Sequence, residues 1–113
     1  MNIKAFFGYE STEIPVDKIF TLTEEVLDDL YAASTEVEQY NIYFHLQNEY
    51  AYLKNANSVK ETAYVCYLIS YYVFVSLTPP HSEKIALYFI QEAINLDECE
   101  KYTGWLDIVK RGN

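Results

Sequence analysis

Residues 62–77 of this chain read TAYVCYLISYYVFVSL, sixteen consecutive residues without a charged side chain. A helix that is apolar nearly all round must be covered by its neighbours. The length favours a helix, at about 59–77, because strands rarely exceed about ten residues. A membrane span needs roughly 20 apolar residues. This stretch is shorter, contains four tyrosines and ends at Thr78-Pro79-Pro80, so we expect a buried central helix and no membrane contact.

The segments on either side predict further helices, because their apolar residues recur at spacings of three and four. The first stripe holds Ile19, Val26, Leu27, Leu30 and Tyr31, and the second holds Ile42, Tyr43, Leu46, Tyr50 and Leu53. Two more helices are expected at 82–96 and at about 98–110. The sequence therefore predicts a single all-α domain over residues 1–113, with about five helices in antiparallel hairpins, as a tetratricopeptide-like or irregular bundle.

Capping boxes, in which a Ser, Thr or Asp precedes a Glu by three residues, mark the expected helix starts. The four matches are Thr21/Glu24, Thr35/Glu38, Ser58/Glu61 and Asp97/Glu100. Pro79-Pro80 followed by Ser82 marks a fifth start, since proline is tolerated in a first turn. Residues 1–14 fit a short strand or an extended arm, because Ile3, Ala5 and Phe7 alternate along the segment.

Residues 86–97 read ALYFIQEAINLD and resemble the second helix of a tetratricopeptide repeat. In that family two alanines seven residues apart let paired helices approach closely, and Ala86 and Ala93 match them. The closing proline of the family is replaced by Glu98, and the preceding helix lacks the Trp and Gly pattern. A solenoid needs about three repeats. The resemblance therefore implies an antiparallel helix pair.

Catalytic and metal-binding patterns are missing from the sequence. His45 and Glu49 are four residues apart, but two ligands do not make a zinc site, and a polar patch is the expected role of His45. Gly8, Gly104 and Gly112 are isolated, so no phosphate-binding loop exists. We expect no enzyme activity, no metal and no cofactor. The two cysteines and the lack of a signal peptide indicate reduced thiols and a cytoplasmic location.

Charge is distributed unevenly along the chain. Residues 1–49 hold ten acids and two lysines, a net charge of 2 − 10 = −8, whereas residues 50–113 hold seven acids and six bases, a net charge of −1. A nucleic-acid-binding protein needs a basic stripe. The whole chain has 8 basic residues against 17 acids, so direct binding to nucleic acid is disfavoured.

The predicted first helix carries an acidic face, which the start of the second helix continues. The candidate partner-binding residues are Asp17, Glu24, Glu25, Asp28, Asp29, Glu36, Glu38 and Tyr40. Glu24/Asp28 and Glu25/Asp29 are like-charge pairs that each cost roughly 0.2–0.5 kcal/mol. Hardly any Lys or Arg is interspersed, and Tyr40 lies off the apolar stripe. Two interpretations remain open: a solvated face that maintains solubility, or a surface that binds a basic partner.

A small, acidic, aromatic-rich helical protein without catalytic motifs is similar in character to bacterial immunity proteins of the contact-dependent inhibition type. That resemblance implies binding and neutralisation of a cognate protein toxin with a basic surface, often a nuclease. One alternative is a phage-derived nucleic-acid mimic, such as an anti-CRISPR or anti-restriction protein, which would spread its carboxylates at phosphate-like spacing. Another alternative is a helical-hairpin adaptor subunit.

Overall fold

The computed structural model describes residues 3–8 and 12–112, and helices are the only regular structure in that part of the chain. Two 3-10 helices come first, η1 (Ile3–Phe7) and η2 (Val16–Thr21). They are followed by α1 (Glu24–Ala32), α2 (Glu36–Asn55), α3 (Val59–Tyr71), the π-helical η3 (Tyr72–Leu77), α4 (Ser82–Leu96) and α5 (Glu100–Arg111). The predicted all-α fold with about five helices is confirmed.

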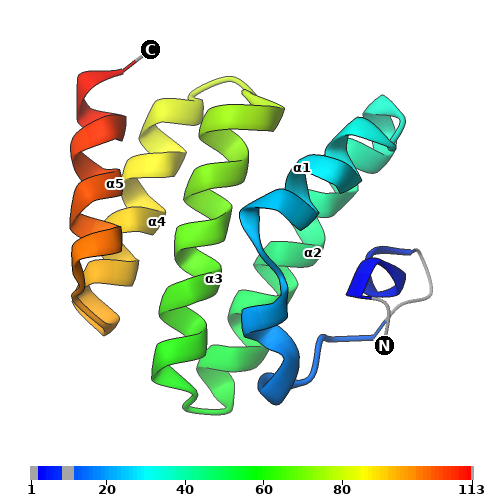
Figure 1. The fold of residues 1–113 in the computed structure, drawn as a ribbon, viewed down its shortest axis with the longest axis horizontal. Helices are drawn as coiled ribbons and strands as arrows, with labels where there is room; N and C mark the ends of the chain where they lie inside the picture. Colours follow the sequence, from blue (N-terminus) through cyan, green and yellow to red (C-terminus); the bar gives the residue numbers. More distant parts are fainter. Residues whose placement is uncertain (1–2, 9–11, 113) are drawn as a thin grey trace.

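The helices α2 to α5 alternate in direction, so each is antiparallel to the next (Figure 1). The helix α3 occupies the centre, with α4 and α5 on one side and the α1–α2 hairpin on the other. Residues 3–7, for which the sequence suggests a strand or an arm, form η1 instead. No strand exists among the described residues to offer an edge for pairing.

The uncharged stretch forms the core, as expected. Residues 62–70 of α3 are all buried, and the helix continues without a break into η3. The π-helical turn closes where the Thr78 N–H donates to the Val73 carbonyl at 3.0 Å. One cluster of buried residues extends from Ile14 to Val109 and includes side chains from all five α-helices. In the part of the chain that the structure describes, no helix has the length and apolar character needed to span a membrane.

Of the four predicted capping boxes, one forms and three do not. At α2 the Thr35 N–H donates to the Glu38 carboxylate at 2.8 Å, and the Glu38 N–H donates to Thr35 Oγ1 at 3.3 Å. The cap of α1 is Thr23 rather than Thr21, because residues 16–21 are already used by η2. Helix α5 is preceded by Cys99, so Asp97 does not cap it.

Two further helices, α3 and α4, begin where the sequence predicts, but neither has a side-chain hydrogen bond at its cap. Ser58 precedes α3, but its side chain makes no cap hydrogen bond, so the expected box with Glu61 does not form. Helix α4 begins at Ser82, after a turn in which the Ser82 N–H donates to the Pro79 carbonyl at 3.0 Å. His81 takes the left-handed conformation in that turn.

The alanines of the tetratricopeptide-like segment lie at a helix contact. Ala86 and Ala93 of α4 are both fully buried. The Ser70 hydroxyl of α3 donates to the Ala86 carbonyl at 2.7 Å, so the small side chain at 86 lets the two helices approach closely. The indole N–H of Trp105 in α5 donates to Ser70 Oγ at 2.9 Å and attaches the last helix to the same point.

Candidate partner-binding surface

The eight candidate residues lie on three consecutive elements. Asp17 belongs to η2, the next four acids belong to α1, and Glu36, Glu38 and Tyr40 open α2. Helix α1 lies in front of α2 in Figure 1, and the turn at 33–35 joins them. The structure therefore places the candidates on one helical hairpin and its approach, but it gives them different roles.

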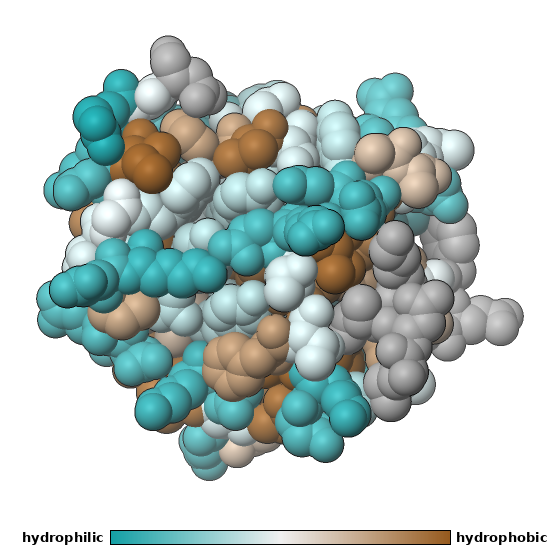
Figure 2. Space-filling view, viewed as in Figure 1, coloured by the Kyte–Doolittle hydropathy of each residue, from teal (hydrophilic) through white to brown (hydrophobic). Residues whose placement is uncertain are grey.

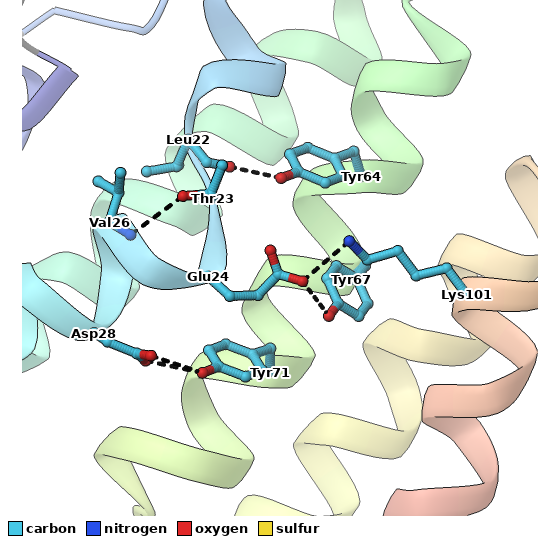
Figure 3. A network of polar contacts seen from close by, with 9 residues as sticks. All are labelled: Leu22, Thr23, Glu24, Val26, Asp28, Tyr64, Tyr67, Tyr71 and Lys101. Carbon is cyan, nitrogen blue, oxygen red and sulfur yellow. Dashed lines mark hydrogen bonds and ion pairs between the residues drawn. The ribbon is translucent and has the colours of Figure 1, made fainter.

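Three tyrosines of α3 bind the α1 segment. We call Tyr64, Tyr67 and Tyr71 the tyrosine row, because their spacing of three and four puts them on one helix face. Their hydroxyls point across to Leu22 and to α1 in Figure 3. Tyr64 donates to the Leu22 carbonyl at 2.7 Å, and Tyr67 donates to Glu24 Oε2 at 2.6 Å. The Tyr71 hydroxyl lies 2.9 and 3.1 Å from the two Asp28 carboxylate oxygens. Glu24 and Asp28 thus attach α1 to α3.

Lys101 of α5 relieves the charge of Glu24. Its ammonium lies 3.0 Å from Glu24 Oε2 and 4.9 Å from the centre of the Tyr67 ring (Figure 3). Hardly any Lys or Arg is interspersed along this helix, but the fold brings a cation to Glu24. The cation comes from a helix that is 77 positions later in the chain.

These contacts shift the pKa values of Glu24 and of the tyrosines that surround it. Partial burial raises the pKa of Glu24, but hydrogen bonds from Tyr67, the backbone and Lys101 outweigh it, so the net pKa is lower than usual. Burial, with the neighbouring Glu24 charge, raises the pKa of Tyr64 to about 12. Burial and the bond to Glu24 raise the pKa of Tyr67. The hydroxyls of these tyrosines are therefore donors at neutral pH.

The remaining candidate acids face solvent. Asp17, Glu25, Asp29 and Glu36 are exposed. Glu38 is exposed too, although its carboxylate accepts the Thr35 N–H, which lowers the pKa of Glu38. Tyr40 is 39% exposed, as expected for a residue off the core stripe. These six residues are free to meet a partner.

Helix α2 also exposes apolar side chains that the sequence analysis missed. Val37 is 63% exposed and Phe44 is 59% exposed. At about 100° per residue, Val37, Tyr40 and Phe44 fall within roughly 60° of one another, on the side away from Ile42 and Leu46. We call Glu36, Val37, Tyr40 and Phe44 the α2 outer face. The sequence does contain a signal for this surface. Val37, Tyr40 and Phe44 form a second apolar stripe on a helix whose first stripe is used in the core, so the second stripe is expected to be exposed.

Figure 2 shows one face of the molecule, on which a hydrophilic band crosses the surface between separate apolar patches. Single exposed apolar residues are ordinary on soluble proteins, whereas contiguous ones indicate contact surfaces. The α2 outer face belongs to the second kind, because its three apolar members are neighbours on one helix.

His45 and Glu49 lie on another flank of α2, beside the N-terminal segment. His45 packs against Phe7, with ring centroids 5.8 Å apart at 81°, and burial lowers the pKa of His45. The Glu49 side chain is buried and accepts the Ile14 N–H at 2.7 Å. Among residues 3–8 and 12–112, no three His, Cys, Asp or Glu side chains gather as a metal site.

Comparison with known proteins adds no relative: no protein-family model, no curated protein and no solved structure gives a significant match to this chain. Its function must therefore be argued from its own residues and geometry.

Proposed function

We propose that this protein is an immunity protein that binds and neutralises a cognate bacterial toxin with a basic, nuclease-type surface. The contact would be made by the α1–α2 hairpin. The observation that carries the proposal is the α2 outer face, where Val37, Tyr40 and Phe44 are exposed side by side next to Glu36.

The two chemistries of the hairpin have separate tasks in binding. Exposed aromatic and aliphatic side chains supply the desolvated centre of an interface, in which tyrosine is enriched. Exposed carboxylates at Asp17, Glu25 and Asp29 attract a basic partner and speed its encounter. A toxin that holds nucleic acid with Lys and Arg presents the complementary charge.

The arrangement supports an inhibitor over a mimic of nucleic acid. A duplex carries about one charge per 1.7 Å, so a mimic needs a long, dense row of free carboxylates. Glu24 and Asp28 are occupied by tyrosine hydroxyls, which leaves fewer free acids on α1 than the sequence suggests. The apolar side chains of the α2 outer face also have no counterpart in a phosphate backbone.

The test starts by capturing partners with the wild-type protein and with Phe44→Asp from cells that express the chain naturally. Tyr88→Asp on α4 is the matched control, because Tyr88 and Phe44 are both 59% exposed. A partner retained by wild type and Tyr88→Asp, but lost by Phe44→Asp, is then produced alone in a bacterial host.

We expect the captured partner to be basic and to stop growth of that host. Co-expression of the wild-type chain or Tyr88→Asp should restore growth, and Phe44→Asp should not. The complex should contain the two proteins in equal numbers. A harmless partner, or full protection by Phe44→Asp, would contradict the proposal.

A further inference from the structure

A small cavity lies between the N-terminal segment and α2, away from the tyrosine row. Its volume is about 20 Å³, enough for one group of the size of a water molecule. Phe6 and Phe7 of η1, Glu13 and Ile14 before η2, and Glu49 of α2 are among its lining residues. Glu49 is roughly 140° around α2 from Phe44, so the cavity is separate from the α2 outer face.

Glu49, which lines this cavity, has one carboxylate oxygen without a partner. Glu49 is only 3% exposed, and the oxygen that accepts the Ile14 N–H is Oε1, at 2.7 Å. The other oxygen, Oε2, is buried without a hydrogen-bond partner among the described residues. An ionised carboxylate only accepts, so Oε2 requires a donor, and a buried acceptor left unsatisfied is destabilising.

Two carboxyl groups, those of Glu13 and Glu49, line the cavity. Burial raises the pKa of Glu49 to about 7, and the nearby charge of Glu13 adds to the rise, while the Ile14 N–H opposes it. His45 also lines the cavity, and burial lowers its pKa, so it is neutral at pH 7 and brings no positive charge. In the described part of the chain, no Lys or Arg forms an ion pair with Glu49.

We propose that this cavity binds a primary ammonium group, with Glu49 Oε2 as its main acceptor. An ammonium group is close to water in size and has three donors, whereas a planar guanidinium is larger. Phe6 and Phe7 also line the cavity, and the face of an aromatic ring attracts a cation. The group could be carried by a lysine side chain of another protein or by a free small amine. The inference stands whether or not the chain neutralises a toxin.

The probe is n-butylammonium, which has the head group and stem of lysine. Protein labelled with ¹³C at glutamate and with ¹⁵N throughout is titrated at pH 8, where Glu49 is ionised, with sodium chloride and tetramethylammonium chloride at equal ionic strength as controls. We expect a saturable change in the Glu49 carboxyl signal and the Ile14 amide signal with butylammonium alone. We also expect the pKa of Glu49 to fall as butylammonium binds.

Glu49→Gln is the matched variant, because its amide oxygen still accepts the Ile14 N–H and its volume is nearly the same. This variant should fold like the wild type and bind butylammonium at least ten-fold more weakly. Equal responses to tetramethylammonium or sodium, or unchanged binding by Glu49→Gln, would overturn the proposal. A lysine blocked at both backbone ends and the free diamine putrescine separate the two sources. Saturation by blocked lysine supports a protein side chain, and saturation by putrescine alone supports a free amine.

Discussion

At the scale of single residues, the tyrosine hydroxyls explain much of the aromatic content. Four buried or half-buried tyrosines of the central stretch donate a hydroxyl hydrogen bond to another segment of the chain. The shortest distance from each hydroxyl to its acceptor oxygen is 2.6–2.9 Å. The four tyrosines are Tyr64, Tyr67, Tyr71 and Tyr72. A phenylalanine would fill the same space but would remove the hydroxyl donor. Tyrosine suits these sites because it combines a large apolar body with a polar tip.

Tyr67→Phe should destabilise the fold measurably. The variant removes a hydroxyl that donates to Glu24 at 2.6 Å, and hydrogen bonds to charged groups contribute roughly 1.5–3 kcal/mol. Lys101 remains beside Glu24, so we expect a loss of about 1.5 kcal/mol in the free energy of unfolding, at the low end of that range. Urea denaturation measures it. Tyr40→Phe is the control and should change stability by less than about 0.5 kcal/mol. Equal effects of the two variants would refute the role of the Tyr67 hydroxyl.

Glu49 should make stability depend on pH in the direction opposite to an ordinary ion-paired acid. The pKa of Glu49 rises from 4.5 to about 7 in the fold, so the folded state binds the proton more tightly than the unfolded state. Its contribution is favourable below pH 4.5 and is lost as pH rises through 7. In amine-free buffer, wild type should therefore lose roughly 2 kcal/mol relative to Glu49→Gln between pH 5 and pH 8. Parallel stability curves for the two proteins would show that Glu49 is not perturbed.

Sequence reasoning located several single residues correctly and missed others for a physical reason. The exposure of Tyr40 follows from its position off the apolar stripe, and the free thiols of Cys66 and Cys99 are confirmed. The burial of Glu49 depends on Ile14, which is 35 positions away. The neutralisation of Glu24 depends on Lys101. Contacts of that sequence separation leave no local pattern.

At the scale of elements, α1 is attached differently from α3. Leu27 is the one fully buried residue of α1, whereas residues 62–70 of α3 are all buried. The remaining attachment of α1 runs through the tyrosine row and through Val26, Leu30 and Tyr31, which are only partly buried against the core. Segments with few buried apolar contacts open at lower free energy than the core does.

Native-state hydrogen exchange should therefore show α1 opening on its own. Amides of residues 24–32 should exchange faster than those of residues 62–70, with a weaker dependence on urea. The triple variant Tyr64→Phe, Tyr67→Phe, Tyr71→Phe should speed exchange in α1 by roughly ten-fold or more, since each lost bond contributes about 1 kcal/mol. If α1 and α3 share one opening free energy and one urea dependence in the wild type, α1 is an integral part of the core.

The boundaries of elements were predictable where local signals agree with packing. Residues 82–96 form α4 as expected, since a proline turn and a regular apolar stripe both indicate the same start. The predicted starts of α1 and α5 are wrong, although Thr21 and Asp97 fit the local capping rule. In the fold Thr21 is the last residue of η2, and Asp97 ends α4. The π-helical turn at 72–77 has no local signal that we recognise.

At the scale of the whole molecule, acids occupy both ends of the helix array, but their surroundings differ. On the hairpin, Glu25 and Asp29 are exposed on α1, close in sequence to the α2 outer face. Glu98, two residues before α5, and Asp107 on α5 are exposed, and α5 lies on the other side of α3 in Figure 1. The distinction between a solvated acidic face and a steering surface can therefore be tested with two variants of equal charge.

The last prediction compares Glu25→Lys/Asp29→Lys with Glu98→Lys/Asp107→Lys. Each double variant changes the net charge by four, from −9 to −5, so their effects on overall attraction to a basic partner are equal. Only the first variant places positive charge at the proposed contact. Its association rate with the partner should fall at least ten-fold further than that of the second at low salt. The difference should shrink as salt rises, because the Debye length shortens from about 30 Å at 0.01 M to about 8 Å at 0.15 M. Stopped-flow mixing measures both rates, and circular dichroism verifies that both variants are folded. If the two variants associate equally fast at every salt concentration, the acids of α1 only keep the protein soluble, and the α2 outer face alone must account for binding.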